Sequence, residues 1–248
     1  MDLTAKYQAI NQRGTELLLA GGDIDPWLSD RAADRRRGLS LIFTLPAHVS
    51  RNISFALGKL REVEPGQNYY PAQDMHVTVI DLIRATPDFA LTPEEEAAYV
   101  SAVKLAVEGG HPFEVAFRGL VTSGSAVMAA GFYQPGLADL RQAVRHHLGV
   151  HKLQLKERYQ QMTAHVTVAR QQAPLIDPHQ DLATLATLAN LNFGTLVIDQ
   201  VELVVHDWYN SRKRVLAKLS LTNCQIKRNF VPKKTSNGLF QPKTLRGR

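Results

Sequence analysis

The sequence has little cysteine, no long apolar run and no acidic residue near its end. Cys224 is the single cysteine in 248 residues, which excludes an internal disulfide and a thiolate metal cluster. No apolar run reaches the length of about eighteen residues that a membrane-spanning helix requires. The start, MDLTAKYQAINQ, lacks the basic segment and apolar stretch of a secretory signal. We therefore expect a cytoplasmic protein with no membrane partner.

The rest of the composition is ordinary, but the charge is uneven. Hydrophobic residues make up 44% and charged residues 21%, and the length allows one large domain or two fused lobes. Residues 225–248 carry seven Lys or Arg and no Asp or Glu. Subtracting these seven charges from the formal +6 leaves about −1 for residues 1–224. Residues 225–248 are thus a basic, flexible tail that either contacts an anionic partner such as RNA or is merely solvated.

Periodicity and breaker residues predict alternating helices and strands. Helices are predicted at 4–20, 48–62, 91–110, 136–148 and 178–190. Strands are predicted at 39–46, 75–83, 113–124, 126–133, 162–170, 195–209 and 214–221. This order predicts an α+β fold with two similar lobes, each a small, mostly antiparallel sheet backed by helices. Residues 1–37 would be a helical extension and residues 38–224 the bilobal domain.

A repeated His-Val-Thr-Val pattern is the clearest feature of the chain. Residues 76–79 and 165–168 both carry it, and a tyrosine, Tyr70 or Tyr159, precedes each histidine by six positions. The copies lie 89 residues apart, about one lobe. Alternate side chains of a strand share a face, so His and Thr would face one way and the valines the core. Two such polar faces can line one groove.

Two imidazoles in one groove suit the cleavage of a phosphodiester. One acts as a base on water or a hydroxyl, and the other protonates the leaving oxygen; imidazole titrates near neutrality and can do either. We therefore predict His76 and His165 as the catalytic pair. The hydroxyls of Thr78 and Thr167 can hydrogen-bond the phosphate oxygens. Since this chemistry needs neither a metal ion nor another cofactor, none is predicted. One such strand alone is usually an ordinary strand histidine, and it is the repetition that favours function.

At these residues the sequence resembles the 2H phosphoesterase superfamily, which includes bacterial 2′-5′ RNA ligase and cyclic phosphodiesterase-like proteins. The family is named for two His-x-Thr/Ser-hydrophobic motifs, and the resemblance covers about residues 38–222. It is strongest at AHVTVAR, residues 164–170, where an arginine closes the strand. The resemblance implies a bilobal fold with a central cleft, the two histidines as catalytic pair and the two threonines as phosphate ligands. The first motif departs from the ligase-like branch, because IDLIRA replaces an aromatic-Leu-Gly ending.

Other side chains are weaker candidates for the cleft. Arg170 lies five residues after His165 and would face away in a strand unless the backbone bends, although the resemblance makes it a candidate phosphate or base contact. Tyr70 and Tyr159 either border the cleft or pack as remnants of the repeat. Arg84 is a weaker candidate than these.

Two further histidine-containing segments are interpreted as structural. His146, His147 and His151 are expected on the surface, because no carboxylate or cysteine pattern completes a metal site. The segment 206–209, His-Asp-Trp-Tyr, could stack on a base, but a strand-terminal aromatic cluster is the preferred interpretation.

Three functions are compatible with these features. The favoured one is a metal-independent phosphodiesterase that acts on 2′,3′-cyclic phosphates or 2′-5′ bonds of RNA ends or small nucleotides. The alternatives are an RNA-binding module with a 2H-like cleft and little turnover, and an ATP-independent 2′-5′ RNA ligase working in reverse. Two intact motifs favour an enzyme, because recognition alone does not need both imidazoles.

Overall fold

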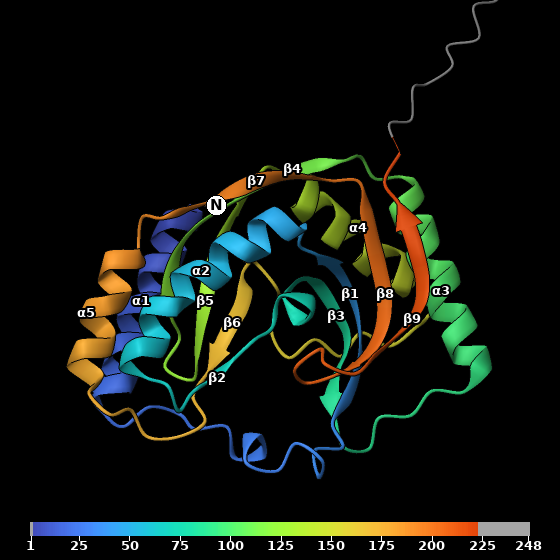
Figure 1. Ribbon diagram of the computed structural model, residues 1–248. Coiled ribbons are helices and arrows are strands. Elements are labelled where there is room, and N and C mark those ends of the chain that lie inside the picture. Colours follow the sequence, from blue (N-terminus) through green and yellow to red (C-terminus); the bar gives the residue numbers. More distant parts are fainter. Residues whose placement is uncertain (1, 223–248) are drawn as a thin grey trace, which may run out of the picture.

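The computed structural model describes residues 2–222. The fold is α+β, with nine strands in one antiparallel sheet that curls around the middle of the molecule (Figure 1). The helices are α1 (Leu3–Leu19), α2 (Ala47–Val63), α3 (Pro93–Glu108), α4 (Gly136–Val150) and α5 (Pro178–Leu188), with 3₁₀ helices at Pro26–Leu28 and Ala72–Asp74. The strands are β1 (Arg37–Thr44), β2 (Asn68–Tyr69), β3 (His76–Thr86), β4 (Phe113–Thr122), β5 (Ala126–Tyr133), β6 (Val166–Arg170), β7 (Asn192–Ile198), β8 (Gln200–Asp207) and β9 (Lys213–Ser220).

Local signals explain most of the helix boundaries, and all five predicted helices are confirmed. At the start of α3, the Thr92 hydroxyl accepts a hydrogen bond from the Glu95 N–H, and the Glu95 carboxylate accepts one from the Thr92 N–H. This reciprocal cap satisfies two N–H groups that have no partner within the helix. Asp2 caps α1 and Asp177 caps α5 in a similar way, each through its carboxylate.

One predicted strand, residues 195–209, is wrong because it is two strands. β7 pairs with β4, whereas β8 pairs with β1 and β9. Only Asp199 separates β7 from β8. The apolar pattern runs through this position without a glycine or proline, which is why the sequence indicated a single strand. The strand predicted at 162–170 is also too long, since β6 covers only its second half.

The strand order shows how strongly the sheet is curved. The order is β7-β4-β5-β6-β3-β1-β8-β9, and β2 pairs with β6 off this path. β7 lies at one edge and β8 is next to the opposite edge, yet a single residue joins them. The two ends of the sheet must therefore approach each other, as the run from β7 to β8 in Figure 1 shows.

The two halves of the sheet interleave along the chain instead of forming a separate sheet in each predicted lobe. β3, β1, β8 and β9 form one half, β6, β5, β4 and β7 form the other, and β3 pairs with β6 at the centre. α3 packs against β9, whereas α2 packs against β7 and α1 against β4; α4 packs on α3 and contacts both β3 and β4. In Figure 1 the helices form two groups, with α3 and α4 on one side and α1, α2 and α5 on the other.

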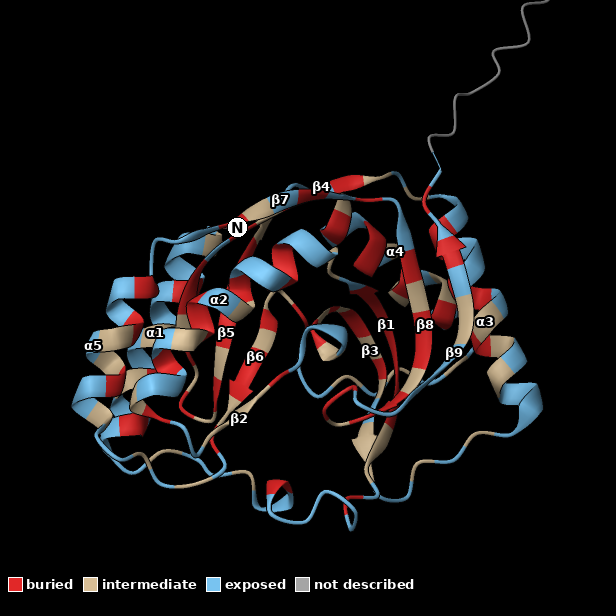
Figure 2. Cartoon of the chain, in the orientation of Figure 1, coloured by how far each residue is buried: buried red, intermediate tan, exposed pale blue. Residues whose placement is uncertain are grey.

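The valines of the repeated motif point into the core, as the strand pattern predicted. Val77, Val79, Val166 and Val168 are all fully buried, whereas the histidines and threonines between them are half-buried. Figure 2 shows buried residues along the strands and along the inner sides of the helices, with exposed residues on the outer sides. Among the described residues, no helix is both long and apolar enough to cross a bilayer.

Candidate active site

The two histidine motifs lie next to each other in the centre of the sheet, because β3 and β6 pair directly. His76 and Thr78 from the first motif and His165 and Thr167 from the second line one cleft, whose empty volume is about 740 Å³. The structure therefore brings together the four side chains that the sequence proposed for acid–base catalysis and phosphate binding.

A β-bulge interrupts each motif strand just after its threonine. In β6, the pairing with β5 steps from Thr167 directly to Ala169. In β3, the pairing with β1 steps from Thr78 directly to Ile80. The skipped valine, Val168 in β6 and Val79 in β3, is the extra residue of the bulge. The residues after it therefore lie on the face opposite to the one that regular alternation would give them.

The bulges turn the fifth residue after each histidine into the cleft. These residues are Arg170 in β6 and Asp81 in β3, and both line the cleft beside the histidines. The bulge is the backbone bend that Arg170 needs to share the face of His165, so Arg170 lines the cleft for which the family resemblance made it a candidate. The two motifs place different groups at equivalent positions, a carboxyl group in the first and a guanidinium in the second.

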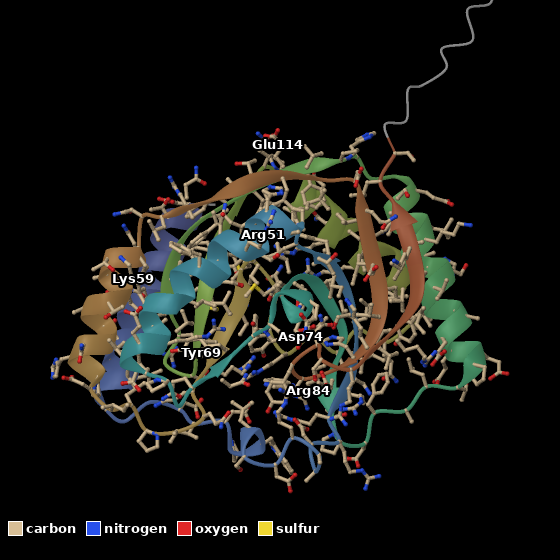
Figure 3. The ribbon with its side chains drawn as sticks, viewed as in Figure 1. Arg51, Lys59, Tyr69, Asp74, Arg84 and Glu114 are labelled. Atoms are coloured by element: carbon tan, nitrogen blue, oxygen red, sulfur yellow. The ribbon has the colours of Figure 1, made fainter. Side chains whose placement is uncertain are left out.

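Both catalytic candidates are held through the same ring nitrogen. The His76 Nδ1–H donates to the backbone carbonyl of Asp74 at 2.8 Å, near the start of β3 in Figure 3. The His165 Nδ1 lies 2.8 Å from the Thr163 hydroxyl. Each ring therefore keeps its Nε2 for a group in the cleft, and its orientation is fixed by a neighbour in its own strand segment.

Burial and positive charge disfavour protonation of both rings. Burial lowers the pKa of His76 to about 3, and the nearby His206 acts in the same direction. Burial lowers the pKa of His165 to about 4, helped by the positive charges of Arg141 and Arg170. Both imidazoles are therefore neutral near pH 7 before an anion binds. The negative charge of a phosphodiester would favour the protonated form and raise these pKa values.

The positive charge of the cleft comes from three arginines, Arg84, Arg158 and Arg170. The Arg170 Nε donates to the hydroxyl of Tyr70 at 3.0 Å, and Tyr70 is buried. Tyr159 also lines the cleft, but its side chain is 55% exposed. The two tyrosines of the repeat therefore differ, because one anchors an arginine and the other offers its ring to solvent.

A third imidazole, His206, lies in the same cleft, 6.0 Å from His76 between ring centroids. The His206 Nδ1–H donates to the carbonyl of Asp207, and Nε2 lies 2.8 Å from the Ser40 hydroxyl. That hydroxyl lies 2.8 Å from an Asp81 carboxyl oxygen. Asp81, Ser40 and His206 thus form one hydrogen-bonded chain. Every position in it is satisfied when Asp81 and His206 share one proton, because the Ser40 hydroxyl can donate to one of them and accept from the other. Burial raises the pKa of Asp81 and lowers the pKa of His206, so both move toward their neutral forms.

Arg141 of α4 joins the two motif strands from the core side. Its side chain is 2% exposed, and its guanidinium donates to the carbonyls of Val79 at 2.6 Å and Thr163 at 2.7 Å. It also donates to the Tyr133 hydroxyl at 3.2 Å. One buried cation therefore holds the backbone of the first motif against the segment that precedes the second.

Several of the residues that shape the cleft were not predicted from the sequence. A signal for Asp81 existed, since it lies five positions after His76, as Arg170 does after His165. The segment 206–209, interpreted as an aromatic cluster, contributes two cleft side chains, His206 and Trp208. The missed residues are Ser40, Asp81, Arg141, Arg158, Gln161, His206 and Trp208.

The histidines expected on the surface lie outside this cleft. His146 is exposed on α4, and His151 is exposed directly after it. Within residues 2–222, no three His, Cys, Asp or Glu side chains lie close enough together to hold a metal ion. The described part of the chain thus presents imidazoles, hydroxyls and guanidinium groups for chemistry in the cleft.

Known proteins share this fold. TT0787 from Thermus thermophilus has a TM-score of 0.56 and 20% identity, over 75% of this chain and 97% of that one. E. coli LigT complexed with ATP has a TM-score of 0.51 and 18% identity, over 75% of this chain and 99% of that one. LigT complexed with 3′-AMP has a TM-score of 0.52 and 19% identity, with the same coverage. No curated protein matches the sequence.

The sequence itself also matches a family model. Residues 48–210, well over half of the chain, match the model described as the 2′-5′ RNA ligase superfamily. This range includes both His-Val-Thr-Val motifs and ends within the loop after β8. With the same fold in LigT and TT0787, this match shows that the chain belongs to the 2′-5′ RNA ligase superfamily of 2H phosphoesterases.

Proposed function

We propose that the chain is a phosphodiesterase that hydrolyses 2′,3′-cyclic phosphates or 2′-5′ bonds of RNA ends or small nucleotides. The observation that carries the proposal is the matched pair of His-x-Thr faces in one cleft, each ring tethered at Nδ1. Each half of the sheet then acts as one lobe, with His76 on one and His165 on the other. The nucleotide complexes of LigT support a nucleotide ligand, since that protein was crystallised with ATP and with 3′-AMP.

The reaction is an in-line displacement at phosphorus with one imidazole on each side. One histidine takes a proton from water while the water oxygen forms its bond to phosphorus. The other gives a proton to the ribose oxygen while its bond to phosphorus breaks, so the ring opens to a phosphomonoester with net addition of one water. Thr78, Thr167 and Arg170, which line the cleft, would bind the non-bridging oxygens, where negative charge accumulates. The two histidines exchange protons with solvent before the next turnover.

The test is hydrolysis of 2′,3′-cyclic mononucleotides and 2′-5′ dinucleotides, with the products separated by chromatography. His76→Ala and His165→Ala should each lower the rate about a hundredfold or more, as expected for loss of a general acid or base. His146→Ala is the matched control, because this exposed histidine of α4 lies outside the cleft, and it should keep the parent rate. EDTA should leave the parent rate unchanged. Parent rates in both cleft variants would contradict the proposal.

A further inference from the structure

A second groove continues from the His165 side of the cleft along the N-terminal helix. We call it the α1 groove; its empty volume is about 1430 Å³, and α1, the β4–β5 turn and residues 158–163 form its walls. His165, Thr167 and Arg170 line both the cleft and the α1 groove. A chain attached to a phosphate at the two histidines can therefore pass directly into this groove.

One stripe of α1 faces the groove. Lys6, Ile10, Arg13 and Leu17 line it, and their spacing of four, three and four residues places them along one side of a helix. At a rise of about 1.5 Å per residue, the stripe is about 16 Å long. This length suits a short run of nucleotides better than a single one.

The neighbouring stripe of α1 fixes the helix to the sheet. The Tyr7 hydroxyl donates to the carbonyl of Gly131 and accepts from its N–H, both at 3.1 Å. The Asn11 side chain accepts from the Thr122 N–H at 2.9 Å. Gly14 packs so closely that a Cβ there would lie 2.1 Å from the Thr122 carbonyl oxygen. The cations on the adjacent stripe are thus presented from a rigid wall and not from a loose extension.

The lining of the α1 groove combines positive charge with apolar surface. Lys6, Arg13, Arg158 and Arg170 line it, and none of its described lining residues is Asp or Glu. Between these cations lie apolar and aromatic side chains, namely Ile10, Leu17, Met128, Tyr159 and Met162. Cations that track a phosphate backbone, interleaved with surfaces on which bases stack, are what single-stranded nucleic acid requires. A duplex would hide its bases from such a surface.

We propose that the α1 groove binds the single-stranded RNA that leads away from the reacting phosphate, so that the substrate is an oligoribonucleotide end. This inference rests on the proposed function for the position of that phosphate. α1 precedes residues 48–210, the part of the chain that matches the family model, whereas the other walls of the groove lie within that part. The groove would select substrate length without changing the chemistry at the histidines.

The experiment measures binding separately from turnover. Fluorescence anisotropy is recorded for oligoribonucleotides of increasing length that carry a fluorophore and a terminal 2′- or 3′-phosphate, the two ends that opening of a 2′,3′-cyclic phosphate can leave. The double variant Lys6→Gln/Arg13→Gln should lose two phosphate contacts. The slope of log affinity against log salt concentration should therefore flatten by about 1.4, and the affinity at 0.1 M salt should fall roughly 20-fold. Turnover of a 2′,3′-cyclic mononucleotide should remain at the parent rate, because that substrate does not reach α1.

The matched control is Arg51→Gln/Lys59→Gln, which also removes one arginine and one lysine. Both of these residues are exposed on α2 (Figure 3), outside the groove. This control should keep parent affinity and salt dependence. Equal affinity in Lys6→Gln/Arg13→Gln and parent, or the same loss in the control, would overturn the inference. Polyglutamate competing as well as RNA would also overturn it, because a general polyanion surface would then suffice. If cyclic phosphates are not hydrolysed but binding still depends on Lys6 and Arg13, the proposed function fails while the groove stands.

Discussion

The two catalytic candidates have similar tethers but depend on the substrate for their charge. Both rings are neutral near pH 7 in the free protein, since burial lowers the pKa to about 3 for His76 and about 4 for His165. General acid catalysis requires one of them to be protonated. A bound phosphodiester supplies a negative charge within the same cleft, which raises the pKa of an adjacent imidazole. In the proposed reaction, the substrate would therefore help to create the acid that cleaves it.

This coupling predicts two different pH profiles. The profile of kcat/KM reports the free protein, so its optimum should lie on the acidic side, near the two lowered pKa values. The profile of kcat reports the complex, and its optimum should lie at higher pH, closer to neutrality. The diester stays singly charged over this range, so its own titration does not shift either profile. Coincident optima, measured with a 2′,3′-cyclic mononucleotide, would contradict substrate-assisted protonation.

At the scale of elements, α4 holds the two motif strands in register through Arg141. This guanidinium has no carboxylate partner among the described residues and is satisfied by carbonyls and a tyrosine hydroxyl. Removing it leaves the buried carbonyls of Val79 and Thr163 without a donor. Each such orphaned group costs about 1–3 kcal/mol.

Arg141→Ala should therefore lower the free energy of unfolding by about 3 kcal/mol or more, measured by urea denaturation. Arg145→Ala on the same helix is the control. Arg145 pairs with Glu157 at 2.7 Å near the surface, and such pairs contribute about 0–1 kcal/mol. Similar losses in the two variants would mean that Arg141 contributes no more than a surface ion pair.

Strand patterning could predict which face of each motif is polar, but not which way the residues beyond each bulge point. The alternation of His, Val, Thr and Val predicted the buried valines and the shared cleft of the four polar residues. The bulges themselves could not be predicted, because each adds one residue without leaving a glycine or proline in the sequence, so alternation alone did not show that Arg170 and Asp81 turn into the cleft. The strand predicted at 195–209 failed for a related reason, since apolar alternation continues through Asp199.

At the scale of the whole molecule, the cleft draws on parts of the chain that no local pattern connects. Ser40 and His206 are 166 residues apart and meet only because β1 pairs with β8. Arg170 likewise meets Tyr70 across 100 residues of sequence. Repetition alone revealed the two histidines, whereas the other groups required the strand order. The curled sheet is therefore part of the site, since it determines which side chains face the cleft.

Two parts of the molecule carry positive charge without acidic residues: the lining of the α1 groove and residues 225–248, which lie outside the described residues. The sequence puts seven Lys or Arg and no acidic residue in that segment. We predict that deleting residues 226–248 weakens the binding of long RNA and flattens its salt dependence by about 0.7 per lost phosphate contact. Short oligoribonucleotides and cyclic mononucleotides should be affected little, because the groove and the cleft accommodate them. The measurements are anisotropy titrations at several salt concentrations and mononucleotide turnover.

The rival role for this segment is structural, because Phe230, Leu239 and Phe240 could pack against the body of the protein. Thermal melting separates the two roles. Loss of packed aromatic and leucine side chains would lower the melting temperature, whereas loss of charges that contact only RNA would leave it unchanged. A large fall in melting temperature with unaltered affinity for long RNA would refute the RNA-binding role. An unchanged melting temperature with a weaker, less salt-dependent affinity would instead establish two basic surfaces, one that gathers RNA and one that guides its end to the histidines.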